Sequence, residues 1–462
     1  MKKLALTLGL LVITGLGFAQ SIVGDWYGAL KLPSGSLRLV FHISQNGDTY
    51  TTLMDSPDQG AKGFASGVTT LSNNIINVDA SVRGITYTGT FLPDSNKING
   101  TFKQGGASFP MSFSRTPVVI SIVRPQDPKD FPYKQEEISF DNPKGNDRLA
   151  GTLTMPADGK ASKIVVLITG SGPQNRNEEL MGHRPFLVLS DWLTRQGIAV
   201  LRYDDRGVAK STGVFGTATT ADFADDAEAA VKYILSRADL KNLEIGLLGH
   251  SEGGIIAPMV ASRNKNVKFV VLLAGPGVPV IDLMVKQTQD QMRGAPQPLI
   301  DFASGLNKAL YQIVAQSPKD STQLLKMKLD MVSMKFIRTM PGEDFTKDQI
   351  QTLLQANNQL LTPWARYFYS INPADYLNKL KCPVLAIDGT LDLQVDGETN
   401  LAAIKANVEK GGNKQVTILK FDNLNHLMQK AQTGKVDEYQ HISTTIEPEV
   451  LTAISDWIGK LK

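Results

Sequence analysis

The sequence of 462 residues predicts a small all-β domain followed by a larger α/β domain with a mostly parallel sheet. Three observations support this prediction. Residues 20–115 are rich in Gly, Ser, Thr and Asn, with short runs in which apolar and polar side chains alternate. Residues 116–134 contain four prolines. From about residue 135, apolar runs alternate with segments of helical periodicity.

The N-terminal region has the pattern of short strands separated by turns. Residues 37–43, 86–91 and 98–102 are strand-like runs, and turn residues such as Asn46-Gly47 separate such runs. Strands at this spacing are typical of a small barrel or sandwich. We therefore expect an all-β domain over 20–115, and the prolines predict an extended linker over 116–134.

The second domain begins with a pair of expected strands at 137–140 and 149–154. Continuous β-branched runs predict strands buried on both faces, and apolar stripes predict helices on both faces of the sheet. The later expected strands are 164–168, 198–203, 243–248, 269–273, 384–387 and 416–420. The expected helices are 186–196, 222–237, 253–263, 398–409 and 448–461. Between about 280 and 370 buried strands give way to helical stretches, at 321–337 and 346–361, which predict a helical insertion over one edge of the sheet.

Composition excludes several classes of function. Hydrophobic residues make up 42% and charged residues 20% of the chain, as in a globular protein with a substantial core. A net charge of +3 does not favour binding to nucleic acid or to an anionic membrane surface. No Cys/His/Asp cluster has zinc-ligand spacing, and no glycine-rich loop ends in Lys-Ser or Lys-Thr. The sequence therefore indicates neither a metal nor a nucleotide cofactor.

The first residues predict a secretory signal peptide over 1–19. Lys2 and Lys3 precede an apolar run from Leu4 to Phe18, and small residues before the end of the segment suit cleavage after Ala19. The alternative is a membrane anchor, but the run is short for a span of roughly 20 residues. No later stretch is apolar enough to cross a bilayer. We expect a secreted or periplasmic protein with no stable membrane insertion.

Two other features have structural interpretations. Cys382 is the single cysteine, so the chain has no internal disulfide. It precedes an apolar run, which is typical of a buried core thiol. The charged run over 202–207 follows an expected strand and suits either a pocket wall or a structural ion-pair cluster. We assign it no part in the chemistry.

A Gly-x-Ser-x-Gly motif, Gly249-His250-Ser251-Glu252-Gly253, directly follows one expected strand and opens the next expected helix. This is the context of a nucleophilic serine on a sharp strand-to-helix turn, where the flanking positions must be small. The N-terminus of the helix favours negative charge that develops during a reaction. An ordinary serine between glycines requires none of this context, so Ser251 is the candidate nucleophile.

A nucleophilic serine needs a base, and the chain has five histidines. In enzymes with this serine turn the base comes last, on the loop after the final strand. His426 has that position, a short loop after the strand expected at 416–420. His42 belongs to the β region, whereas His183 precedes a helix and His441 lies in a late loop. His250 is the variable residue of the motif, and we expect it to point elsewhere.

The acid that orients the base should follow the strand expected at 384–387. Asp388, Asp392 and Asp396 all do so. Asp388 ends the strand or begins its loop, whereas Asp392 lies where the loop would reach the histidine. We therefore select Asp392, with Asp396 and Asp388 as alternatives.

An oxyanion hole for this chemistry needs two backbone N–H groups. One belongs to Glu252, the residue after the candidate nucleophile. The other should come from the loop that follows the strand at 164–168, Thr169-Gly170-Ser171-Gly172-Pro173. We select Ser171, with Gly172 as the alternative.

Residues 135–462 resemble the secreted bacterial esterases of the α/β-hydrolase superfamily, in the branch near dienelactone hydrolases and the catalytic domains of prolyl-oligopeptidase relatives. The matching segments are TGSGPQNRNE at 169–178, LRYDDRGVAKSTG at 201–213, TATTADFADDAEAAVKYI at 217–234, LGHSEGG at 248–254, DGTLDLQV at 388–395 and LNHLMQ at 424–429. The resemblance implies an α/β-hydrolase fold with a helical cap, and Ser251, Asp392 and His426 as its catalytic triad. Thr169 departs from the pattern, because many relatives have histidine there, and this departure concerns the second oxyanion donor.

The expected function is hydrolysis of small-molecule carboxylic esters by a serine carboxylesterase, and the resemblance implies short acyl chains. A peptidase is the first alternative, but the β region is much shorter than the propeller of prolyl-oligopeptidase relatives. A thioesterase is the second, and a non-catalytic binding module is the third. Residues 20–115 suit a module that binds carbohydrate, lipid or a partner, or equally a structural or dimerising role in a homodimer.

Overall fold

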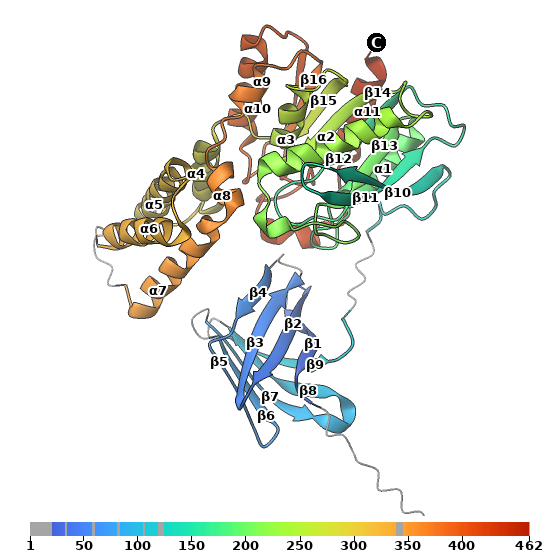
Figure 1. Cartoon of the computed structure of the whole chain (residues 1–462). Coiled ribbons are helices and arrows are strands. Elements are labelled where there is room, and N and C mark those ends of the chain that lie inside the picture. The colour runs from blue at the N-terminus through green and yellow to red at the C-terminus, as the bar shows by residue number, and fades with distance from the viewer. Residues whose placement is uncertain are drawn as a thin grey trace, which may run out of the picture. The chain divides into compact units, whose positions relative to one another are not determined.

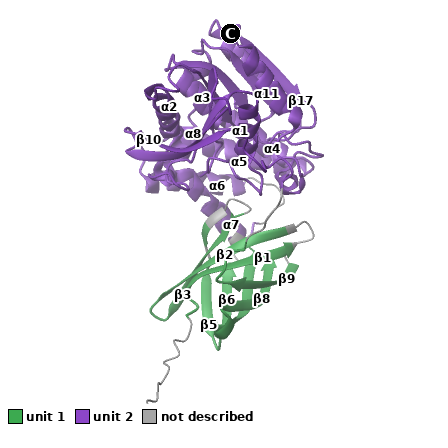
Figure 2. Cartoon of the chain, turned by 90° about the vertical axis from the view of Figure 1, so that its right-hand side faces the viewer, with its two compact units in different colours: residues 1–120 green, residues 121–462 purple. Residues whose placement is uncertain are grey.

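The computed structural model describes residues 21–32, 35–57, 61–80, 84–104, 107–118, 124–338 and 345–461. The chain divides into two compact units, residues 1–120 and 121–462 (Figures 1 and 2). The signal peptide expected over 1–19 lies outside the described residues. No described helix has the length and apolar character needed to span a bilayer.

The first unit is an antiparallel β-barrel, which decides between the predicted barrel and sandwich (Figure 1). Its strands are β1 (Gly24–Leu32), β2 (Gly35–Asn46), β3 (Thr49–Ser56), β4 (Ala61–Ala65), β5 (Val68–Ser72), β6 (Ile75–Ala80), β7 (Ile85–Leu92), β8 (Lys97–Gln104) and β9 (Ala107–Ser114), with the short 3-10 helix η3 (Pro93–Ser95) between β7 and β8. They follow the order β2-β1-β9-β8-β7-β6-β5-β3-β4, and a further pairing of β2 with β3 closes the barrel.

Aromatic side chains fill the interior of this barrel. Because successive residues of a strand point to opposite faces, Phe41 is buried while the next residue, His42, is partly exposed. Phe41 stacks on Phe113 with ring centroids 4.2 Å apart, and Tyr87 meets both rings edge-on. Trp26 is fully buried and donates its indole N–H to a backbone carbonyl at 2.7 Å. Stability of this unit therefore comes from packing, with no disulfide.

The second unit is built on an eight-stranded sheet, in the order β10-β11-β13-β12-β14-β15-β16-β17. The strands are β10 (Lys134–Asn142), β11 (Asp147–Met155), β12 (Lys163–Ile168), β13 (Ala199–Tyr203), β14 (Glu244–His250), β15 (Val267–Leu273), β16 (Val384–Gly389) and β17 (Val416–Phe421). The pairs β10–β11 and β11–β13 are antiparallel, and all other neighbours are parallel. The predicted mostly parallel sheet is thus present.

Helices cover both faces of the sheet and bury its apolar runs in two separate cores. One face packs against α1 (Pro185–Arg195) and α11 (Pro448–Lys460). The other packs against α2 (Thr220–Ser236), α3 (Gly253–Ala261) and α10 (Gly397–Lys410). Short helical turns η4 (Phe215–Thr217), α9 (Ala374–Leu377) and η6 (Val436–His441) complete the connections.

A helical insertion separates β15 from β16, as predicted over about 280–370 (Figure 1). It consists of α4 (Val280–Gln291), α5 (Gln297–Gln316), α6 (Thr322–Ile337), α7 (Lys347–Ala356), the 3-10 helix η5 (Asn357–Leu361) and α8 (Pro363–Phe368). We call these helices the cap. The cap has a buried apolar interior of its own, with Leu325 and Leu329 fully inaccessible to solvent. Tyr311 stacks on Tyr369 with ring centroids 4.2 Å apart.

Four details differ from the sequence-based expectations. Strand β14 continues to His250 because that residue still pairs with β15, and β16 continues to Gly389 because it pairs with β17. Arg124, within the linker expected over 116–134, is buried in the second unit and donates hydrogen bonds to three of its backbone carbonyls at 2.6–2.9 Å. Cys382 is partly rather than fully buried, and burial raises the pKa of its thiol to about 11.

Candidate active site

Ser251 lies on the turn between β14 and α3 with a φ of +53°, a left-handed conformation that non-glycine residues rarely adopt. The turn is crowded on both sides. A Cβ atom added to Gly249 would lie 1.9 Å from the carbonyl oxygen of Gly253, and one on Gly253 would lie 2.2 Å from the oxygen of Ile168. The N–H of Ser251 donates to the carbonyl of Leu273 at 3.0 Å. The small flanking residues predicted from the motif are therefore required by backbone contact.

The loop after β17 brings His426 beside this turn. Its Nδ1 lies 2.7 Å from Oδ2 of Asp392, and the two residues are only 4% and 2% exposed. The other oxygen of Asp392 accepts the backbone N–H groups of Gln394, at 2.7 Å, and Val395, at 2.9 Å. The carboxylate is thus held in one orientation toward the imidazole.

The two alternative acids have other partners. Asp396 caps the N-terminus of α10 by accepting the N–H of Thr399 at 2.9 Å. Asp388 is fully buried, and burial together with the negative charge of Asp392 raises the pKa of its carboxyl group well above the usual value. Among the described residues, Asp392 is the carboxylate that bonds His426.

The loop after β12 lies next to the serine turn. A Cβ atom on Gly170 would lie 3.1 Å from the Cβ of Ser251, which measures how closely the two segments approach. Ser171 lines the cavity, whereas Gly172 is absent from its wall and has a φ of +94°. Within the described part of the chain, the backbone N–H groups of Ser171 and Glu252 donate to no protein acceptor. Both predicted oxyanion donors are therefore available to a ligand.

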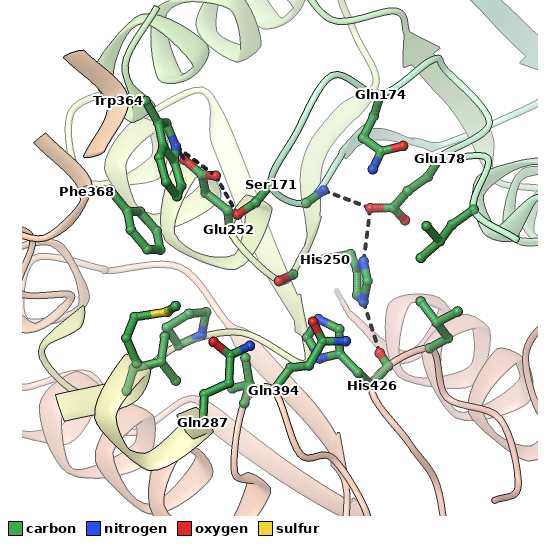
Figure 3. Close-up of a pocket in the computed structure, with 18 residues that line it drawn as sticks. Ser171, Gln174, Glu178, His250, Glu252, Gln287, Trp364, Phe368, Gln394 and His426 are labelled. Atoms are coloured by element: carbon green, nitrogen blue, oxygen red, sulfur yellow. Dashed lines mark hydrogen bonds and ion pairs between the residues drawn. The ribbon is translucent and has the colours of Figure 1, made fainter. Parts of the chain in front are cut away.

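Ser251 and His426 line the same cavity, which has a volume of about 240 Å³ (Figure 3). One end of it is walled by the cap and the other by the loop that follows β12. On the cap side, Trp364 and Phe368 of α8 stack with ring centroids 4.4 Å apart and form a flat aromatic wall. The lining residues are Gly170, Ser171, Gln174, Glu178, Leu180, His250, Ser251, Glu252, Pro276, Leu283, Met284, Gln287, Trp364, Phe368, Gln394, Val395, His426 and Leu427.

A comparison with protein-family models identifies the family of the chain. The family model Hydrolase_4, described as "Serine aminopeptidase, S33", matches residues 184–430. The chain belongs to the serine aminopeptidase S33 family. The match includes the serine turn, the cap, Asp392 and His426, and places the S33 chain among the α/β-hydrolases.

The chain is also similar to individual proteins, at sequence identities below 30%. Esterase EstD of Thermotoga maritima is 28% identical over 316 residues, which is 68% of this chain and 66%, just under two thirds, of that protein. The esterase Pf2001 of Pyrococcus furiosus is 18% identical, with a TM-score of 0.44 over 74% of this chain and 96% of its own. A complex of ferulic acid with Est1E of Butyrivibrio proteoclasticus is 17% identical, with a TM-score of 0.41 over 70% of this chain and 98% of its own.

Glu252 connects the cap of this S33-family chain to the site (Figure 3). Its buried carboxylate accepts hydrogen bonds from Ser171 Oγ at 2.7 Å, Thr220 Oγ1 at 2.7 Å and Trp364 Nε1 at 2.9 Å. Burial raises the pKa of this carboxyl group, although each of the three hydrogen bonds opposes the rise. The side chain next to Ser251 thus holds α2, the loop after β12 and helix α8 together.

His250 and Glu178 are site residues that the sequence reasoning missed (Figure 3). The expectation that His250 points elsewhere was wrong: its ring is buried in the cavity wall, with Nδ1 2.9 Å from Glu178 Oε1 and Nε2 3.0 Å from the carbonyl oxygen of His426. Because β14 extends through His250, the side chain lies at the carboxyl end of the sheet, where the site is. Glu178 is the last residue of 169–178, one of the segments that resemble the esterase family. That resemblance was the sequence feature that could have indicated a role for Glu178.

The charged run over 202–207 contacts the loop that follows β12. Asp205 accepts the hydroxyl of Thr169 at 2.8 Å and the backbone N–H of Gln174 at 2.9 Å. Asp204 forms an ion pair with the buried Arg176 at 2.7 Å. In this S33 chain the run therefore fixes the loop that carries Ser171, which is the structural role left open by the sequence.

Proposed function

We propose that the chain is a serine carboxylesterase that acts through an acyl-enzyme. The hydroxyl oxygen of Ser251 attacks the ester carbonyl carbon while His426 removes its proton. The tetrahedral intermediate collapses, the alkoxide leaves with that proton, and water then attacks the acyl-serine with His426 again as base. The N–H groups of Glu252 and Ser171 stabilise the oxyanion in both steps.

One observation carries this proposal: a buried His426–Asp392 hydrogen bond of 2.7 Å beside a serine with left-handed backbone geometry, in a single cavity. With Nδ1–H donated to Asp392, the lone pair of His426 lies on Nε2. Such a histidine is held in the tautomer that can accept the serine proton, and the carboxylate stabilises the imidazolium that results.

Hydrolysis of a peptide from its amino end is the competing function, because the family is described as serine aminopeptidases. That function requires a carboxylate free to bind the substrate ammonium group. The cavity has two carboxylates, and Glu252 already accepts three hydrogen bonds. Glu178 Oε1 is paired with His250 and with the N–H of Gly170, whereas its Oε2 is buried and has no hydrogen-bond partner in the described part of the chain. The contacts of Glu252 and of Glu178 Oε1 favour a neutral substrate, as does the likeness to an esterase from Thermotoga maritima.

Short acyl chains are the proposed substrates. The stacked rings of Trp364 and Phe368 line the cap side of the cavity, where they would limit the length of the acyl chain. We also propose that the protein is exported through residues 1–19, which places its esters outside the cytoplasm.

The test is hydrolysis of p-nitrophenyl acetate, butyrate and octanoate, with proline p-nitroanilide as the peptidase substrate and acetyl-coenzyme A as the thioester. We expect ester turnover to decrease with chain length, to disappear in Ser251→Ala, and to exceed anilide turnover. Faster cleavage of the anilide would replace the esterase by a peptidase, and faster cleavage of the thioester would replace it by a thioesterase.

A further inference from the structure

We propose that Glu178 and His250 form a charged pair that positions His426 against the loop carrying the oxyanion donors. The inference rests on the proposed function for its kinetic test, but the contacts that define the pair do not depend on that function. Neither residue contacts the reacting atoms in this account, so both are positioning residues.

The pair connects three segments of the site. Glu178 Oε1 accepts the backbone N–H of Gly170 at 2.7 Å and lies 2.9 Å from His250 Nδ1. His250 Nε2 lies 3.0 Å from the backbone oxygen of His426. A continuous chain of hydrogen bonds therefore runs from the residue before Ser171 to the candidate base. Both side chains are at least nine-tenths buried, so water competes little for these bonds.

The geometry also supports a protonated imidazole. Nε2 of His250 faces a carbonyl oxygen, which can only accept, so Nε2 carries a hydrogen. Nδ1 faces an oxygen of Glu178 that also accepts the N–H of Gly170. The proposed pair is an imidazolium, which donates from both ring nitrogens, and the ionised carboxylate of Glu178. Burial alone would lower the pKa of His250, but the charge of Glu178 and the two hydrogen bonds raise it overall.

The pair also packs against the ring of the candidate base. The rings of His250 and His426 have centroids 4.8 Å apart, and the titratable groups facing His250 are Glu178, His426 and Asp392. His250 therefore holds His426 through two contacts, one with its imidazole and one with its backbone oxygen.

The kinetic test uses His250→Gln and Glu178→Gln, measured with p-nitrophenyl acetate from pH 5 to 9. His250→Gln breaks the contact with the backbone oxygen of His426 and should lower kcat about 10- to 100-fold with KM changed less than about threefold, because the candidate base loses its support. Glu178→Gln should lower kcat about 10- to 100-fold with KM changed less than about threefold, because the loop and the base lose their common anchor. Matched controls are His441→Gln and Glu179→Gln, which make the same chemical changes at exposed positions outside the cavity.

A second measurement keeps the proposal falsifiable if a variant folds poorly. Nitrogen-15 NMR of the histidine-labelled wild-type chain, assigned with His250→Gln, should show His250 protonated on both nitrogens at pH 7. A singly protonated His250, or a kcat in folded His250→Gln equal to that of wild type, would overturn the pair. Absence of ester turnover in the wild type would contradict the proposed function and would leave the NMR result to decide on the pair.

Discussion

At the scale of single residues, two aspartates four positions apart, Asp388 and Asp392, have different surroundings. Asp392 accepts two backbone N–H groups and bonds the imidazole of His426. Asp388 is fully buried, and burial together with the charge of Asp392 raises the pKa of its carboxyl group. Strand β16 and the loop after it thus carry one acid that faces the histidine and one buried acid whose ionised form is disfavoured.

Asn substitution distinguishes the two acids. Asp392→Asn should lower kcat about 10³- to 10⁴-fold, because the amide favours the wrong tautomer of His426. Asp388→Asn should keep at least half of the activity. Hydrolysis of p-nitrophenyl acetate by both variants tests the assignment, and an equal loss in the two variants would contradict it.

Stability against pH gives a separate test of Asp388. A carboxyl group whose folded pKa is raised binds more protons folded than unfolded, so stability falls as pH rises above 3.8 toward the folded value. Asp388→Asn removes that loss. Relative to wild type, the variant should gain unfolding free energy between pH 4 and pH 8 in urea titrations. A difference between variant and wild type that does not change with pH would show that Asp388 is charged in the folded protein.

At the scale of elements, the alternation of apolar runs and helical stripes was enough to predict the sheet, the helices and the cap. The serine turn, the loop carrying Asp392 and the loop carrying His426 followed from their places after predicted strands. The roles of His250 and Glu178 did not follow, because they depend on a contact between segments 72 positions apart. Sequence periodicity predicts on which face of a helix or strand a side chain lies. It does not predict which residue of another segment that side chain contacts.

Helix α8 of the cap is coupled to the site through the indole N–H of Trp364. Trp364→Phe keeps an aromatic wall but leaves the buried Glu252 with one donor fewer, which should cost about 1–3 kcal/mol of unfolding free energy. It should also raise KM for p-nitrophenyl butyrate severalfold. The control is Trp457→Phe on α11, which loses an indole hydrogen bond to Thr417 of β17; neither residue lines the cavity. Equal KM values in the two variants would refute the coupling.

At the scale of the whole molecule, the second unit holds the complete candidate site within residues 121–462. The density of prolines predicted an extended linker over 116–134. Proline density carries no information about the residues that such a segment contacts. Arg124 shows the difference. Its guanidinium donates to the carbonyls of Met181, Gln440 and Ile442, so the end of the predicted linker is part of the second unit.

Arg124→Ala tests this attachment. The substitution leaves buried carbonyl groups without their donor and should lower the unfolding free energy by about 2–3 kcal/mol, which corresponds to a few degrees in Tm. Thermal unfolding of the full chain measures it, with Arg38→Ala in the barrel, a partly exposed arginine, as the comparison. A Tm equal to that of wild type would mean that the hydrogen bonds of Arg124 do not stabilise the second unit.

The most direct measurement is the mass of the intact chain quenched in acid during turnover of p-nitrophenyl acetate. The account predicts one added acetyl group in the wild type, located on Ser251 by peptide mapping and absent from Ser251→Ala. In His426→Ala, ester turnover should be almost abolished. An acetyl group on another residue that forms at the turnover rate, or full activity in Ser251→Ala, would contradict the central claim that Ser251 carries the acyl-enzyme.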